Sequence, residues 1–185
     1  MKIELLVSAE EFWPRMRDDL HRATDSAYIQ TFSFEGDRVG TRLARALERA
    51  RARDRRLLVD SYSLLYHSDR LIPGPAWLDR ALRQEVARTH RWIRRLRAGG
   101  TSVRFGNPLG PSPIRLIRRS HKKVVAFDDQ VVYLGGINFS DHNFAWHDMM
   151  LRVESWGSPR WRRRTSGRPG RAGRSRSTAP WVRCG

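Results

Sequence analysis

Three residue types that suit phosphate chemistry stand close together in the chain. His121 and Lys123 are two residues apart, and Asp128 follows after four intervening residues. On an extended strand residues i and i+2 share a face, so we expect the imidazole and the ammonium to project together, with Val124 and Ala126 facing the core. The ammonium would neutralise phosphoryl oxygens while the neutral imidazole attacks phosphorus. The spacing therefore predicts a site that binds a phosphoryl group and presents a nucleophile to it.

A glycine pair follows at a defined distance. Gly135 and Gly136 come after six further residues, and Asn138 is next but one. Such a turn can bring backbone N–H groups and the Asn138 amide to the same phosphoryl oxygens. The chain has three lysines against 33 arginines, so a lysine at this spacing is rarely a coincidence. The bland alternative is a basic strand end that carries a solvated histidine and lysine.

Residues 120–138, SHKKVVAFDDQVVYLGGIN, resemble the signature of the phospholipase D superfamily, H-x-K-x4-D followed six residues later by G-[GS]-x-N. Residues 29–60 look like the first strand, helix and second strand of the cardiolipin synthase branch, and residues 145–154 look like the strand after the motif. The likeness covers about residues 5–154 and corresponds to the N-terminal half of the longer family members.

The resemblance implies a role for each motif residue. His121 would be the nucleophile or its general-acid partner, and Lys123 and Asn138 would hold phosphate together with the glycine pair. Asp128 would be mainly structural. Asp148 would orient the imidazole, following the usual logic of a base and the group that orients it; the alternative is a surface residue of a strand. Gly136 stands where many family members have serine, so one hydroxyl contact to phosphate would be missing.

Four residues near the end of the likeness invite comparison with a metal site. Asp141, His142, His147 and Asp148 carry suitable side chains, but their spacing matches no usual zinc pattern. The family chemistry that the resemblance implies also needs no metal. We therefore expect neither a metal nor another cofactor.

The chain holds one copy of the motif, whereas the family's active site needs two. One histidine attacks while the other protonates the leaving oxygen. Phospholipases and cardiolipin synthases carry both on one longer chain, and the family's small nucleases pair as homodimers. Three interpretations are open: a cardiolipin synthase-like phosphatidyltransferase or hydrolase that works through a phosphohistidine, a homodimeric endonuclease, and an inactive fragment.

The charge of the chain narrows the choice of partner. Lysine and arginine number 36 and the acids 19, a net charge of +17. Nine arginines and no acid lie in residues 157–185, so residues 1–156 carry a net +8. A basic surface attracts anionic headgroups or nucleic acid. Charge alone does not choose, but the resemblance favours an anionic phospholipid over nucleic acid.

Composition also predicts the domain organisation. We expect residues 1–156 to form the phospholipase D-like domain and residues 157–185, rich in Arg, Gly and Ser, to be a disordered tail. That tail looks like the product of a shifted reading frame or a genuine basic arm. Without a signal-peptide core or a run of ~18 apolar residues, we expect a cytoplasmic protein that can rest on the inner face of the membrane. The single Cys184 permits no disulfide within the chain.

The elements that must position the motif form an α/β pattern. An alternating strand over residues 27–34, an amphipathic helix over 39–50 and a strand over 56–62 predict a parallel pair with a right-handed crossover. Further elements are a helix opened by a Ser8–Glu11 capping box, a helix over 77–97 ended by Gly99-Gly100, and strands at 3–7, 101–105, 123–127, 131–134 and 146–153. We predict a mixed sheet flanked by helices, one phospholipase D-like lobe. The aromatic loop 62–67 could touch lipid or pack under the next helix.

Overall fold

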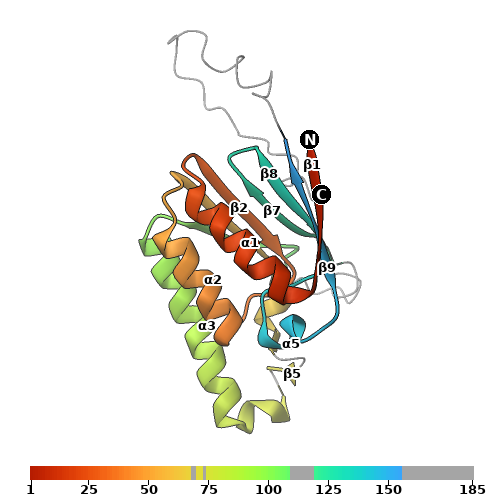
Figure 1. The fold of residues 1–185 in the computed structure, drawn as a ribbon. Helices are drawn as coiled ribbons and strands as arrows, with labels where there is room; N and C mark the ends of the chain where they lie inside the picture. The colour runs from red at the N-terminus through yellow and green to blue at the C-terminus, as the bar shows by residue number, and fades with distance from the viewer. Residues whose placement is uncertain (68–69, 73, 109–118, 156–185) are drawn as a thin grey trace.

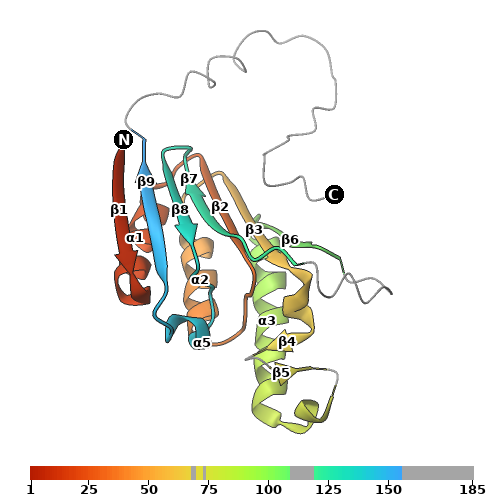
Figure 2. The same ribbon diagram turned by 90° about the vertical axis from the view of Figure 1, so that its right-hand side faces the viewer.

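The structure is a computed structural model that describes residues 1–67, 70–72, 74–108 and 119–155 (Figure 1). The predicted tail, Cys184 and most of the loop ahead of the motif lie outside the described residues. Two layers make up the fold: a mixed seven-stranded sheet and, on one of its faces, three long helices (Figures 1 and 2). The predicted mixed α/β fold is confirmed.

The sheet has the order β1-β9-β8-β7-β2-β3-β6. β2, β3 and β6 run parallel to one another, and every other neighbouring pair is antiparallel. The strands are β1 (Lys2–Val7), β2 (Ser26–Thr31), β3 (Asp54–Asp60), β6 (Ser102–Gly106), β7 (Lys123–Phe127), β8 (Val131–Gly135) and β9 (Met149–Glu154). A separate hairpin joins β4 (Tyr66–His67) to β5 (Arg70–Leu71).

The helices are α1 (Ser8–Arg22), α2 (Arg38–Arg49), α3 (Arg80–Ala98) and the short α5 (Asp141–Phe144), with 3₁₀ turns η1 (Ser61–Leu64) and η2 (Pro75–Leu78). Asp37 caps α2 by accepting the N–H of Gly40 at 2.7 Å, and Asp79 caps α3. The last turn of α3 closes with Gly99, as predicted. α3 begins three residues later than predicted because η2 occupies residues 75–78.

The predicted capping box of α1 forms only in part. Ser8 is the first residue of the helix, with a φ of 72°, and Val7 is its N-cap. Glu11 still reaches back, and its carboxylate accepts the Val7 N–H at 2.8 Å. The glutamate of the capping box therefore accepts an N–H one residue earlier than expected, and no side chain caps the helix from its N-cap position.

The main core lies between the sheet and the helices. Ile29, Leu57, Val103, Val125 and Tyr133 occupy aligned positions on neighbouring strands and are almost completely buried. Since β7 alternates, Val125 and Phe127 share this face with Lys123. The prediction that Val124 and Ala126 face the core was wrong: both are only half-buried and lie on the opposite face.

Among the described residues no helix covers that opposite face (Figure 2), and several of its apolar side chains are exposed. On β1, Ile3, Leu5 and Val7 are 55%, 54% and 47% exposed, and on β8 and β9 Leu134 and Met149 are exposed as well. We call this surface the open sheet face. Single exposed apolar residues are ordinary, but a contiguous group on adjacent strands is typical of a surface that another protein element covers.

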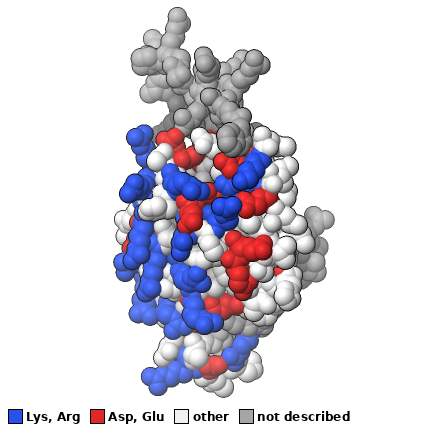
Figure 3. Space-filling view, in the orientation of Figure 1, with Lys and Arg blue, Asp and Glu red and all other residues white. Residues whose placement is uncertain are grey.

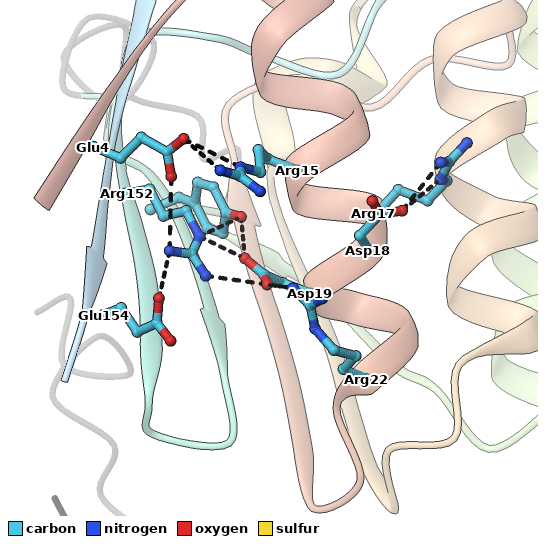
Figure 4. Close-up of polar contacts among 9 residues, drawn as sticks. Glu4, Arg15, Arg17, Asp18, Asp19, Arg22, Arg152 and Glu154 are labelled. Carbon is cyan, nitrogen blue, oxygen red and sulfur yellow. Dashed lines mark hydrogen bonds and ion pairs between the residues drawn. The ribbon is translucent and has the colours of Figure 1, made fainter. Parts of the chain in front are cut away.

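A buried ion-pair cluster joins α1 to β8 and β9 (Figure 4). The Arg152 guanidinium donates to Asp19 at 2.7 and 3.2 Å and to Glu154 at 2.8 Å. The hydroxyl of Tyr133 also donates to Asp19. We call these four residues the Arg152 cluster. Burial alone would raise the pKa of Asp19, but hydrogen bonds from Arg152, Tyr133 and Arg22 outweigh it and hold that pKa below its usual value.

Candidate active site

The predicted motif begins where two central strands meet. β2 and β7 are antiparallel, with Gln30 opposite Val124, so the carboxyl end of β2 lies beside the amino end of β7. Lys123 opens β7, and Phe32 follows directly after β2. The carboxyl ends of the parallel strands β2 and β3 therefore share an edge with the motif, which is where α/β folds commonly place ligands.

Lys123 is a buried cation with few partners. Lys123 is only 9% exposed, and its Nζ donates to the carbonyl oxygen of His121 at 2.8 Å. An ammonium has three donors, and that carbonyl is the one hydrogen-bond acceptor for Nζ among the described residues. Burial lowers the pKa of Lys123, and the negative charge of Asp148 opposes this shift. The side chain is therefore desolvated and retains donors for an anion.

His121 lies beside this lysine although it precedes the strand. Its ring is exposed and stacks on Phe32, with centroids 4.2 Å apart and an interplanar angle of 17°. The Lys123 ammonium lies 5.6 Å from the centroid of the same phenyl ring. Both side chains therefore lie against the ring of Phe32. The predicted common strand face of His121 and Lys123 does not form, because His121 precedes β7 and is exposed whereas Lys123 is buried.

The sequence interpretation missed Phe32. Besides its two side-chain contacts, its backbone N–H donates to Asn138 Oδ1 at 3.2 Å, so it also ties the asparagine to the site. We expected this phenylalanine inside a strand over residues 27–34, but β2 ends at Thr31. A large apolar residue at the carboxyl end of a central strand was the available signal, and nothing local distinguished it from a core residue.

The glycine pair is required by the close approach of β9. A Cβ atom on Gly135 would lie 2.1 Å from the carbonyl oxygen of Met149. A Cβ atom on Gly136 would lie 2.1 Å from both carboxylate oxygens of Asp148. Neither position accepts a side chain without moving its neighbour. Gly136, which stands where many family members have serine, leaves the space that the Asp148 carboxylate occupies.

Asp148 is half-buried and lies against the glycine pair. Its Oδ1 accepts the N–H of Met149 at 2.8 Å. Within the part of the chain that the structure describes, no hydrogen bond joins Asp148 to the ring of His121. The negative charge of Asp148 acts instead on Lys123, where it opposes the lowering of the pKa by burial. The orienting role that the resemblance implied for Asp148 stays a prediction.

Asn138 connects the site to its surroundings. Its Oδ1 accepts from the Phe32 N–H and from the Thr31 hydroxyl at 3.3 Å, and its Nδ2 donates to Asn143 Oδ1 at 3.1 Å. The carboxamide oxygen thus holds the end of β2, while the nitrogen holds α5. The second N–H of the Asn138 amide remains for a phosphoryl oxygen. The phosphate contact of Asn138 stays a prediction.

Asp128 lies away from this group. It is at the other end of β7, and five residues of strand span roughly 16 Å. Its carboxylate accepts the backbone N–H groups of Thr24, Asp25 and Ser26 at 2.9, 2.9 and 2.8 Å. These bonds fasten the β7–β8 turn to the segment that leads into β2. These contacts are those of a structural residue, which is the role that the resemblance implied for Asp128.

The chain just ahead of the motif is anchored by a buried pair that the sequence did not predict. Arg119 Nη1 donates to Asp60 Oδ1 at 3.2 Å and to the carbonyl oxygen of Asn107 at 2.7 Å. Both side chains of the pair are almost completely buried. Asp60 also accepts from Asn107 Nδ2 at 2.6 Å. The end of β3 thereby fixes the residue two positions before His121.

The acidic residues at the starts of α2 and α5 serve the fold. Asp141 accepts the N–H of Val39 at 2.9 Å and pairs with Arg38, while Asp37 accepts the N–H of Asp141. These crossed contacts tie the start of α2 to the start of α5. Burial raises the pKa of Asp37 to about 6, against the hydrogen bonds it accepts. Among the described residues no group of three or more His, Cys, Asp or Glu side chains is arranged to hold a metal.

Comparison with known proteins gives a consistent family. Residues 16–160 match the sequence model of the family described as cardiolipin synthase, PLD-like domain. Cardiolipin synthase B of Salmonella typhi is 26% identical over 164 residues, which cover 83% of this chain and 35% of that protein. The chain thus spans about a third of the length of the curated relatives it matches.

None of the helices in the described ranges is long and apolar enough to cross a bilayer.

Solved structures share the fold at low identity. Phosphatidylserine synthase from Haemophilus influenzae superposes with a TM-score of 0.60 at 16% identity, covering 82% of this chain and 33% of that one. Nuc from Salmonella typhimurium, a phospholipase D family member, gives 0.52 at 17% identity, covering 83% of this chain and 82% of that one. One lobe of this kind therefore occurs both inside a larger chain and as nearly a whole chain.

Proposed function

We propose, because this chain belongs to the cardiolipin synthase, phospholipase D-like domain family, that it supplies one half-site of an enzyme that transfers or hydrolyses phosphatidyl groups. The observation that carries the proposal is the pairing of His121 with Lys123 around Phe32. A desolvated ammonium with unused donors attracts a phosphoryl group, and an exposed imidazole beside it can attack phosphorus.

The proposed reaction has two displacements at phosphorus. A ring nitrogen of His121 forms a bond to phosphorus as the bond to the leaving alcohol oxygen breaks, and an acid on a second half-site gives that oxygen a proton. An incoming alcohol then gives its proton to the conjugate base of that acid, and its oxygen forms a bond to phosphorus as the phosphorus–nitrogen bond to His121 breaks. Water in place of the alcohol gives hydrolysis. Lys123 would balance the charge of the phosphoryl oxygens in both steps, and a spare N–H of Asn138 would assist.

The open sheet face supports the need for a second half-site. It exposes apolar side chains, and two of them, Leu134 and Met149, adjoin Gly135 and Asp148 of the candidate site in the chain. A second copy of this chain, or the remainder of a longer polypeptide, would cover that face and bring the acid. The proposed substrate is an anionic phospholipid, which suits both the family and the net charge of +17. We place the working protein in the cytoplasm, at the inner face of the membrane.

Incubation with phosphatidylglycerol in mixed micelles tests this proposal, with cardiolipin and free glycerol as the measured products. His121→Ala should abolish turnover, and acid quenching of the active protein should trap a phosphohistidine that the variant lacks. His90→Ala, an exposed histidine on α3, is the matched control and should keep full activity. Turnover that survives His121→Ala would rule out the proposed nucleophile.

A homodimeric endonuclease is the second candidate. One observation favours it: a phospholipase D family chain of nearly the same extent, Nuc, is covered over 82% of its length by this lobe. Nicking of plasmid DNA in EDTA, with light scattering to detect a dimer, separates this candidate from the first. A monomer that neither nicks DNA nor turns over phosphatidylglycerol would identify an inactive half of a larger enzyme.

A further inference from the structure

We infer that the surface formed by β5, η2 and the first turns of α3 docks on an anionic lipid bilayer. It projects beyond the sheet at one end of the molecule, where Figure 2 shows β5 and the start of α3. The inference deepens the proposed function, because it says how a lipid would reach the site. Docking is measured without turnover, so the two can fail separately.

Three large apolar side chains are exposed on this segment. Leu71 of β5 is 40% exposed, and Trp77 and Leu78 of η2 are 44% and 82% exposed. We call these residues the apolar tip. An indole and two leucines that stand in water are well suited to the boundary between lipid headgroups and acyl chains.

Polar contacts fix the backbone beneath the apolar tip. Arg70 pairs with Asp79 at 2.6 Å, which joins the hairpin to the N-cap of α3. Arg83 donates to the carbonyl oxygens of Trp77 and Leu78 at 2.6 and 3.0 Å. The three apolar side chains are therefore presented on a held backbone, and little ordering would be needed for them to enter an interface.

Arginines surround the apolar tip and continue along α3. Residues 70–97 contain eight arginines and two acids. Arg80, Arg91 and Arg94 are exposed, and no ion pair to any of them is found among the described residues. Figure 3 shows lysine and arginine covering the side of the molecule formed by α2 and α3, while the acids gather over α1. Arginine near a bilayer adds attraction to anionic headgroups.

The combination favours a bilayer over nucleic acid. The phosphates of either partner would satisfy the arginines, but only a bilayer offers an apolar phase for Trp77 and Leu78. The aromatic loop 62–67, which the sequence left open between lipid contact and packing, is buried or half-buried along its length. His67 lies with its Nε2 3.0 Å from the Thr89 hydroxyl of α3, so the loop packs against the helix.

A stack of rings connects this segment to the candidate active site. Tyr66 of the hairpin stacks on Tyr62 with centroids 4.3 Å apart, and Tyr62 stacks on Phe32 at 5.2 Å. Phe32 in turn stacks on His121 at 4.2 Å. The hairpin that carries Leu71 is thus in unbroken contact with the motif histidine. A protein seated on the apolar tip would hold the half-site over the headgroups beside it.

Sedimentation of the full chain with lipid vesicles tests the inference. We expect strong binding to vesicles of phosphatidylcholine mixed with phosphatidylglycerol and weak binding to phosphatidylcholine alone. Trp77→Ser and Leu78→Ser, combined, should weaken binding to the mixed vesicles about tenfold or more. The matched control is Trp146→Ser, an exposed tryptophan outside both the apolar tip and the open sheet face, which should bind as the parent does. Circular dichroism melting checks that each variant is folded.

Charge reversal and competition give the remaining outcomes. Arg91→Glu with Arg94→Glu should weaken binding to the mixed vesicles, and added salt should do the same. If the combined Trp77 and Leu78 variant binds vesicles as tightly as the parent, while duplex DNA displaces the protein from them, the surface is a general polyanion site and the inference is overturned. Vesicle binding by a protein that shows no turnover would leave the docking surface standing and remove the proposed function.

Discussion

Two cations are buried on the same face of one sheet, and their surroundings differ. Arg152 of β9 bonds Asp19, Glu154 and the Tyr133 oxygen, and its pKa is raised, first by its hydrogen bond to Asp19. Among the residues that the structure describes, Lys123 of β7 donates to one carbonyl oxygen, and burial lowers its pKa. One cation is surrounded by built-in acceptors, and the other is not.

The difference separates a structural cation from one that is prepared for a ligand. A buried charge with complete partners holds elements together and has nothing left to bind. A buried charge with few partners costs folding free energy and is retained where an anion repays that cost. The contrast argues that the Lys123 end of the sheet is the functional one, independently of the motif.

The largest effect on stability is expected when Arg152 is lost. Arg152→Met leaves Asp19 buried without its main partner, which should lower the free energy of unfolding by about 3–5 kcal/mol. Urea denaturation measures this. Arg17→Met, on the exposed side of α1, is the control and should change little. A loss below about 1 kcal/mol for Arg152→Met would contradict the structural role.

Lys123→Met should reverse that pattern. Removing an incompletely paired buried lysine in favour of an apolar side chain of similar shape should leave the free energy of unfolding unchanged or slightly higher. Phosphatidyl transfer should fall about 10²- to 10³-fold, because a charge that stabilises the transition state is lost. The same two measurements, urea denaturation and product formation, apply. The comparison breaks if this variant is as unstable as Arg152→Met.

Asp128 is a motif residue that should behave like the Arg152 cluster. Asp128→Asn keeps the left-handed backbone, which asparagine tolerates, but loses the charge and one acceptor for the N–H groups of residues 24–26. We expect a loss of about 1–2 kcal/mol in unfolding free energy and, in the folded protein, unchanged affinity for inorganic phosphate. Asp129→Asn, next in the chain, is the control. A variant of normal stability that no longer binds phosphate would move Asp128 into the site.

The smallest effect concerns pH. An ammonium binds anions below its pKa and loses them as the pH rises through it. Asp148 raises the pKa of Lys123, so Asp148→Asn should lower that pKa further. Phosphate affinity measured by calorimetry should then fall at a lower pH than in the parent, a few-fold loss that is largest at alkaline pH. An unchanged pH profile would mean that Asp148 acts elsewhere.

Local patterns were enough to predict much of the fold. The strand-helix-strand unit of β2, α2 and β3 follows from alternation and periodicity. Spacing alone did not give the arrangement of His121 and Lys123, because His121 precedes β7 and does not share a strand face with the lysine. The facing of β7 did not follow, because Val124, Val125, Ala126 and Phe127 are all apolar and give no alternation. Only the tertiary packing of helices on one face decides which of them is buried.

Contacts between distant segments were also beyond the sequence. Phe32 reaches the motif because β2 and β7 pair across about 90 residues, and Arg119 finds Asp60 through a similar closure. Neither residue has a local signal that separates it from ordinary core or surface positions. The bonds from Asp128 to residues 24–26 are of the same kind, although the family resemblance had indicated that this aspartate braces the fold.

The close approach of Gly136 to Asp148 couples two positions of the candidate site. A side chain at position 136 would meet the Asp148 carboxylate, which is the far end of a flexible side chain and can turn aside. A serine placed there would therefore shift the carboxylate whose negative charge acts on Lys123. The shape of the glycine turn and the charge beside the lysine cannot be redesigned separately.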